Sequence, residues 1–316
     1  MQRIIFIPQY PAKMRYQEWW YWKLPEEFEK RGFEVLTIGR NIEGEKTSEM
    51  FSPINAAIEY ETEQINEYMN LKLRDDDILF LADLSFPGIF CNALYHKRCS
   101  KMFAFCHATS INKKDYFEDV SYSKFGTECS HSVLFDTIFV GSEYHRKKLR
   151  NAAPEYWDNL RITYLPFNPI KSYLLLPKYN DIMSASRPTP QKVDMELENY
   201  VIKNGFEINR PVSNSWLEYY QNLSTSKILL ITAIEDTFGY QIVDAIVNHC
   251  VPIARNGLAY PELLPEEYLY DSKEGMMALI HKVLDGKLGV PELKCYRWMN
   301  SFYDHICNVM RGHHEW

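Results

Sequence analysis

Three carboxylates and a glycine stand close together at one predicted strand-to-helix junction. The stretch IEDTFGYQIVDAI, residues 234–246, carries Glu235, Asp236, Gly239 and Asp244. A glycine there lets the backbone approach a ligand, and the amides after it would begin a helix. Helix-start amides favour a phosphate, whereas carboxylates favour the hydroxyls of a sugar or a ribose. The stretch therefore indicates a sugar-phosphate pocket, although a helix capped by Asp236 with Asp244 in solvent also explains it.

A pair of cations upstream of this junction suggests chemistry at a diphosphate. Arg187 and Lys192 lie five residues apart in ASRPTPQKVD, on a loop that enters a predicted helix. Two cations there would clamp a diphosphate and stabilise it as a leaving group. They would supply the charge that a metal otherwise brings, and we see no Asp-x-Asp loop to hold one, so we expect no metal. Taken alone, the pair also fits a solvated helix start.

Together, these motifs resemble the second domain of the GT-B glycosyltransferases, in particular the large retaining family 4 group. That group carries two glutamates separated by seven residues, the first in Glu-x-Phe-Gly, with an upstream Arg and Lys that hold the diphosphate. Here DTFGYQIVD places Asp236 and Asp244 at these positions, each one methylene shorter, with Glu235 as an alternative for the first. The resemblance covers residues 180–285, including AIVNHCVPIARNG, and the first half only in architecture.

The resemblance implies a metal-independent, retaining glycosyltransferase whose co-substrate is a nucleotide-diphosphate sugar of UDP type, with no further cofactor. It assigns Arg187 and Lys192 to the leaving diphosphate and Asp244 to the ribose. The helix-start amides would hold the phosphates, and Asp236 or Glu235 would bind the sugar. The implied donor-binding residues are Glu235, Asp236, Thr237, Phe238, Gly239, Tyr240, Gln241 and Asp244.

Such enzymes hold the acceptor with the first domain, where this sequence offers mixed aromatic and basic residues. The loop after the first strand, PQYPAKMRYQEWWYWK, lacks the glycine pair common in that position. Its rings and cations suit stacking on a base or a sugar, although tryptophans buried in the core explain them too. His107 ends the strand KMFAFCHA and would orient the sugar or the acceptor, unless it is a satisfied loop histidine. The expected acceptor-binding residues are Tyr10, Lys13, Arg15 and Asn112.

Alternating strand and helix patterns would place these residues at strand ends. The first half shows apolar runs and helical patterns in turn, and the alternation restarts after prolines at 166, 169 and 177. This predicts an α/β fold of the GT-B type, with two Rossmann-like βα domains facing across a cleft. The predicted domains are 1–171 for the acceptor, 172–290 for the nucleotide sugar, and a C-terminal helix at 291–316 that crosses back to the first domain.

Composition bears on the binding partners and the cellular compartment of the protein. The 316 residues are 46% hydrophobic and carry a formal net charge of -7, which argues against a general polyanion binder. Seven cysteines without a C-x-x-C pair indicate reduced thiols in a cytoplasmic protein. The sequence has no run of about 18 apolar residues, so we expect no stable membrane insertion. The oligomeric state stays open.

Three classes of function compete for this sequence. The first is transfer to a hydroxymethylated pyrimidine in DNA, as some phage enzymes of this general fold do, and the basic-aromatic first loop suits it. The second is transfer to a lipid or polysaccharide, for which the helical pattern at 17–31 is too acidic at its end. The third is a nucleotide-sugar epimerase or nucleotide-binding protein. The basic stretch at 145–150 is either a solvated helix face or a contact to a phosphate backbone.

Overall fold

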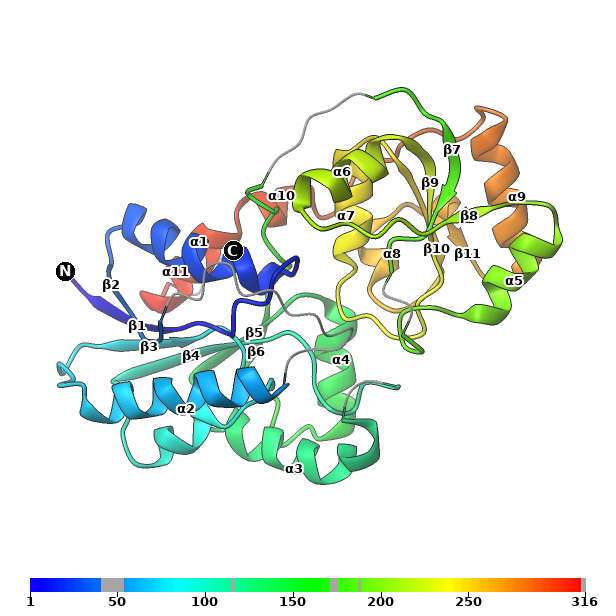
Figure 1. Ribbon diagram of the computed structural model, residues 1–316. Helices are drawn as coiled ribbons and strands as arrows, with labels where there is room; N and C mark the ends of the chain where they lie inside the picture. The colour runs from blue at the N-terminus through cyan, green and yellow to red at the C-terminus, as the bar shows by residue number, and fades with distance from the viewer. Residues whose placement is uncertain (41–53, 115–116, 171–175, 187–188, 314–316) are drawn as a thin grey trace. The chain divides into compact units, whose positions relative to one another are not determined.

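The chain forms two parallel β-sheets, each covered by helices, in the computed structural model (Figure 1). The structure describes all residues except 41–53, 115–116, 171–175, 187–188 and 314–316. It divides into a first unit of Met1–Pro169 with Trp298–Trp316 and a second unit of Ile170–Arg297. The predicted α/β fold with two Rossmann-like domains is confirmed.

The first sheet has six parallel strands in the order β2-β1-β3-β4-β5-β6. Every residue of β1, β3 and β5 is buried, because helices cover both faces, as is usual for a parallel sheet. The short apolar runs that the sequence shows therefore become the core. The strands are β1 Arg3–Ile7, β2 Glu34–Thr37, β3 Ile78–Leu81, β4 Lys101–Cys106, β5 Thr137–Val140 and β6 Leu160–Ile162.

Figure 1 shows helices α1 and α11 on one face of this sheet and α2 and α3 on the other. On α1, Trp19 and Trp20 are buried and Trp22 is exposed, so two of the three tryptophans serve the core. The helices of this unit are α1 Tyr16–Lys30, α2 Ile54–Asn70, α3 Ser121–Ser132, α4 Glu143–Ala152 and α11 Phe302–Met310, with α10 Tyr296–Asn300 at the boundary and 3-10 helices η1 Phe90–Tyr95 and η2 Glu118–Val120.

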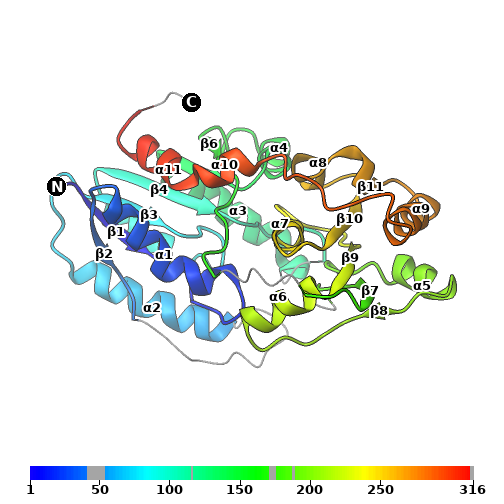
Figure 2. The same ribbon diagram turned by 90° about the horizontal axis from the view of Figure 1, so that it is seen from above.

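Helix α11 packs on α1, and both views show the two helices beside each other (Figures 1 and 2). The fully buried ring of Phe302 lies 5.8 Å from the ring of Trp20 and 6.3 Å from that of Phe105. Arg31 at the end of α1 pairs with Asp304 at 2.6 Å. Residues at the C-terminal end therefore complete the core of the first unit.

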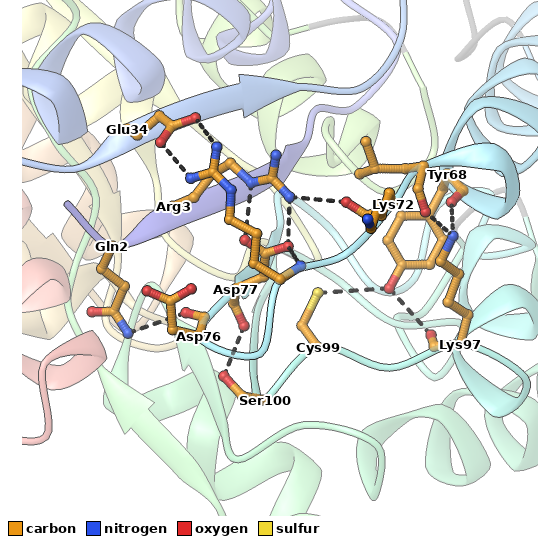
Figure 3. A network of polar contacts seen from close by, with 12 residues as sticks. Gln2, Arg3, Glu34, Tyr68, Lys72, Asp76, Asp77, Lys97, Cys99 and Ser100 are labelled. Atoms are coloured by element: carbon orange, nitrogen blue, oxygen red, sulfur yellow. Dashed lines mark hydrogen bonds and ion pairs between the residues drawn. The ribbon is translucent and has the colours of Figure 1, made fainter.

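A buried ion pair joins the amino ends of β1 and β3 (Figure 3). Arg3 contacts both carboxylate oxygens of Asp77, at 2.7 Å from Nη2 and 2.9 Å from Nε. The backbone amide of Arg74 donates to the same carboxylate, and its guanidinium pairs with Glu34 on β2. This network ties three strands together at the edge opposite their carboxyl ends, so Asp77 has a structural role.

The second sheet has five parallel strands in the order β11-β10-β9-β7-β8. Figure 1 shows α6 and α7 on one face and α5 and α9 on the other. The strands are β7 Asn180–Met183, β8 Ile208–Asn209, β9 Ser226–Ile231, β10 Val251–Arg255 and β11 Leu269–Tyr270. The helices are α5 Met195–Lys203, α6 Trp216–Ser224, α7 Tyr240–Val247, α8 Tyr260–Leu263 and α9 Lys273–Leu284, with the 3-10 helix η3 Glu266–Tyr268.

One segment of the first unit has a helical sequence pattern but no α-helix. The stretch FPGIFCNALYHKR at 86–98 yields only the 3-10 helix η1, and Gly88 near its start has a φ of 83°. This backbone conformation does not fit the first turn of an α-helix.

Candidate active site

The glycine turn between β9 and α7 has the geometry that a closely approaching ligand needs. Gly239 has a φ of 98°, and a Cβ there would lie 2.9 Å from Cε1 of Tyr260. It is the N-cap of α7, so no side chain caps the helix at that position. The alternative of a helix capped by Asp236 is therefore wrong, because Asp236 lies before the turn.

Lys192 and Asp236 meet beside this turn. Nζ of Lys192 lies 3.3 Å from Oδ1 of Asp236 and donates to the carbonyl of Glu235 at 3.3 Å. The hydroxyl of Tyr260 donates to the other oxygen of Asp236 at 3.3 Å. Lys192 and Asp236 are both half-buried, so each keeps contact with solvent. The structure brings this predicted cation and carboxylate together, whereas Arg187 lies outside the described residues.

Backbone hydrogen bonds fix the two loops that carry this pair. The carbonyl of Gln191 accepts from the amide of Ile234 at 2.9 Å and from that of Glu235 at 3.1 Å. These loops follow β7 and β9, which are neighbours in the sheet, so both lie at its carboxyl edge. Ligands of open parallel sheets bind outside this edge.

Asp244 is buried one turn into α7, which excludes the alternative that it lies in solvent. Burial raises the pKa of Asp244 to about 7, and a hydrogen bond from the hydroxyl of Tyr219 at 3.3 Å opposes the shift. A buried carboxyl with a raised pKa is one feature by which functional sites are recognised. Tyr219 and Tyr260 are site residues that the sequence reasoning missed, since their only signal is their place on α6 and after β10.

The other predicted donor residues are either half-buried near the turn or buried beneath it. Gln241 accepts from the hydroxyl of Ser186 at 3.0 Å, and Thr237 and Tyr240 are half-buried beside it. Glu235 is almost fully buried, next to Asp236. Phe238 is also buried and packs edge-on against the ring of Tyr240 at 5.2 Å, so it supports the turn from inside.

In the first unit, His107 lies at the carboxyl end of β4 among aromatic rings. Its ring centroid is 4.3 Å from that of Tyr16, 4.4 Å from Phe105 and 4.6 Å from Trp20. Burial, with a smaller effect from His145, holds the pKa of His107 well below its usual value. The imidazole is therefore neutral at pH 7.

Asp83 lies beside His107 and was missed by the sequence reasoning. It follows β3, accepts from Nε2 of Gln9 at 2.6 Å, and accepts from the amide of Ser85 at 3.2 Å. Burial raises the pKa of Asp83 to about 8, against the backbone hydrogen bonds from Ser85 and His107. An acidic residue directly after a buried strand was the available signal.

The predicted acceptor residues differ in their exposure. Tyr10 is buried against Tyr60, at 5.9 Å between ring centroids, so its ring belongs to the core instead of an open surface. Asn112 is also buried and accepts from Nζ of Lys148 at 2.8 Å. Lys13 and Arg15 are half-buried at the start of α1.

Two further properties concern metals and membranes. Within the described ranges, no three His, Cys, Asp or Glu side chains lie together in a way that could hold a metal ion. Every helix among the same residues is too short or too polar to span a bilayer.

The chain resembles known proteins mainly in fold. No protein-family model matches it. The lipopolysaccharide outer core galactosyltransferase WaaB superposes with a TM-score of 0.62 and 15% identity, over 98% of each chain. TarM of S. aureus, crystallised with UDP, gives a TM-score of 0.55 and 12% identity over 79% of this chain. These neighbours are glycosyltransferases of the GT-B class, and this chain has their fold.

Sequence similarity to a curated protein is confined to a short segment. The tRNA-queuosine alpha-mannosyltransferase of Drosophila melanogaster is 39% identical over 59 residues, which is 19% of this chain and 16% of that protein. The chain likewise spans 57% of TarM.

Proposed function

We propose that this protein is a glycosyltransferase that moves a sugar from a nucleotide-diphosphate donor to an acceptor hydroxyl. The observation that carries the proposal is the meeting of Lys192 and Asp236 beside the Gly239 turn, at the carboxyl edge of the second sheet. A cation, a helix start and a carboxylate at one edge suit a diphosphate and a sugar. The GT-B fold supports the reaction class, and UDP in the crystals of TarM supports a UDP-type donor.

Each group would have a distinct role in this reaction. Lys192, together with Arg187, would stabilise the departing diphosphate, so that transfer needs no metal. The first amides of α7 would bind the phosphates. Asp236, oriented by Tyr260, would accept hydrogen bonds from sugar hydroxyls, and Asp244 would bind the ribose. The resemblance to the family 4 group supports transfer with retention.

His107 would bind an acceptor or sugar hydroxyl in the first unit. Because its imidazole is neutral, a ring nitrogen that carries no proton can accept a hydrogen bond from a hydroxyl.

The acceptor that we propose is a hydroxyl on a modified base of a nucleic acid. A hydroxymethylated pyrimidine in DNA is the first candidate, from the basic and aromatic residues of the first loop. The segment shared with a tRNA-queuosine mannosyltransferase favours a modified base in tRNA as a second candidate. The likeness to WaaB favours a lipopolysaccharide acceptor as the alternative outside nucleic acids.

Thermal-shift measurements with UDP, GDP and ADP sugars test the donor site. We expect one of them to raise the melting temperature, because a ligand bound only to the folded state stabilises it. Lys192→Ala should weaken that ligand about ten- to a hundredfold, since it removes a charge-assisted contact to a phosphate. Lys227→Ala is the matched control, because Lys227 forms an exposed pair with Asp181 in the same unit.

Transfer of a radiolabelled sugar then separates the acceptors. Hydroxymethylated DNA, tRNA and lipopolysaccharide are offered in parallel, and label in either nucleic acid supports the proposal. Unchanged melting with every nucleotide sugar refutes the donor site. Binding without transfer to any acceptor favours an epimerase or a nucleotide-binding protein.

A further inference from the structure

A groove of about 490 Å³ lies on the first unit, between α4 and the loop after β4. None of its lining residues is acidic. They are Ile111, Tyr144, Lys147, Lys148, Asn151 and Ala152.

One stripe of α4 supplies most of this lining. Its residues are spaced three or four apart, which places them on one side of the helix. They are Tyr144, Lys147, Lys148 and Asn151. The opposite side carries His145 and Leu149, which are buried. The sequence of α4 therefore separates a packing face from a polar, basic face.

The two lysines bring local positive charge to a chain with a net charge of -7. Lys147 is exposed, and Glu143 lies 3.6 Å away, a distance at which a surface ion pair is weak. Lys148 donates to the amide oxygen of the buried Asn112 at 2.8 Å, and this neutral group helps to fix the position of the ammonium.

The groove adjoins the carboxyl edge of the first sheet. Ile111 follows β4 by a short loop that starts with His107, and α4 begins directly after β5, where Ser142 caps the helix through the amide of His145 at 3.0 Å. A polymer held in the groove would therefore pass close to the edge where His107 lies.

We infer that this groove binds the phosphodiester backbone of the nucleic acid that carries the acceptor base. Lysines that neutralise phosphates supply affinity without reading sequence, and asparagine and tyrosine side chains commonly add hydrogen bonds to phosphate oxygens. The inference rests on the proposed function, because a nucleic-acid acceptor is what a basic groove at this edge would hold. The groove would be the surface that binds the backbone of that acceptor.

Binding measured across salt concentrations tests the inference on the full chain. The probes are unmodified duplex DNA, unmodified tRNA and vesicles of phosphatidylserine with phosphatidylcholine. For the nucleic acid that binds, the double variant Lys147→Ala/Lys148→Ala should reduce the slope of log affinity against log salt by about 1 to 2, because each lost phosphate contact lowers it by about 0.7 to 0.9. Lys147→Arg/Lys148→Arg keeps the charges and should retain the slope.

The control variant Lys203→Ala/Lys282→Ala removes two exposed lysines from the second unit and should leave binding unchanged. Binding of the nucleotide sugar by thermal shift is followed in every variant, so that loss of the donor site is seen separately from loss of the groove. Equal slopes for the wild type and Lys147→Ala/Lys148→Ala would overturn the inference. Vesicle binding that depends on these lysines, without nucleic-acid binding, would overturn it as well.

Discussion

At the scale of single residues, Gly239 has the least freedom in the candidate donor site. Its φ of 98° disfavours any L side chain, and the ring of Tyr260 occupies the space that a Cβ would need. Since Tyr260 also holds Asp236, a change at this glycine acts on the turn and on the carboxylate together.

Gly239→Ala should lower the free energy of unfolding by about 2 kcal/mol, from backbone strain and the contact with Tyr260. It should also abolish the thermal shift by the nucleotide sugar. Gly205→Ala separates these effects, because Gly205 has a φ of 91° but no atom within 4 Å of the place that a Cβ would take. Denaturant unfolding and thermal shift measure both variants, and equal loss of donor binding in the two would contradict the assignment.

Asp83 should make stability depend on pH. Its pKa is raised to about 8 in the folded protein by burial, whereas an unfolded aspartate titrates near its ordinary value of about 3.9. The folded state therefore binds more protons between these values, and the free energy of unfolding falls as pH rises from about 4 to about 8.

Asp83→Asn, which mimics the protonated acid, should remove part of this slope. Denaturant unfolding of both proteins from pH 5 to pH 9 measures it, with the variant gaining on the wild type as the pH rises. Parallel curves would show that Asp83 carries no raised pKa. Asp244 in the second unit is left in place in both proteins, so its titration cancels in the comparison.

Single residues also show how far the sequence alone leads. The meeting of Lys192 with Asp236 beside the Gly239 turn was predictable. Both loops follow strands of one parallel sheet, and loops after neighbouring strands meet at its carboxyl edge. Tyr260 was not predictable, since its contact with Asp236 depends on the packing of α8, a helix of four residues. The burial of Tyr10 in the core depends likewise on Tyr60 of α2, far along the chain.

At the scale of elements, apolar runs in the sequence predict most of the strands. Helix α3 and strand β6 are two elements that the sequence pattern does not predict. Helix α3 has the polar sequence SYSKFGTECSHS, with a glycine inside it, so no clear apolar face announces it. Strand β6 has only three residues, next to prolines that indicate a linker. In both cases packing against the rest of the unit decides the structure, and local pattern does not contain that information.

The packing of α11 on α1 makes a prediction at this scale. Phe302→Ala should lower the free energy of unfolding by about 3 to 5 kcal/mol, because it leaves a cavity between Trp20 and Phe105. Tyr122→Ala is the control, since the side chain of Tyr122 is 93% exposed and its loss should change stability by less than about 0.5 kcal/mol. Denaturant unfolding measures both, and similar values would show that α11 adds little to the core.

At the scale of the whole molecule, the chain divides into two units at a stretch rich in proline. The prolines at 166 and 169 lie where the first unit gives way to the second, at Pro169 and Ile170. Which sheet receives the C-terminal helix is a different question, because the apolar face of a helix does not specify its partner. In the structure, α11 packs on the first sheet's helix α1. Phe302 contacts Trp20, and Asp304 pairs with Arg31.

Because Trp298–Trp316 belongs to the first unit, the backbone leaves that unit once and returns to it once. During translation, the ribosome must therefore make the whole of the second unit before the residues that cover Trp20 exist. Until then the rings of Trp20 and Phe105 lack the contact that Phe302 provides. Truncation of the chain after the second unit would therefore remove packing contacts from α1, near the N-terminus.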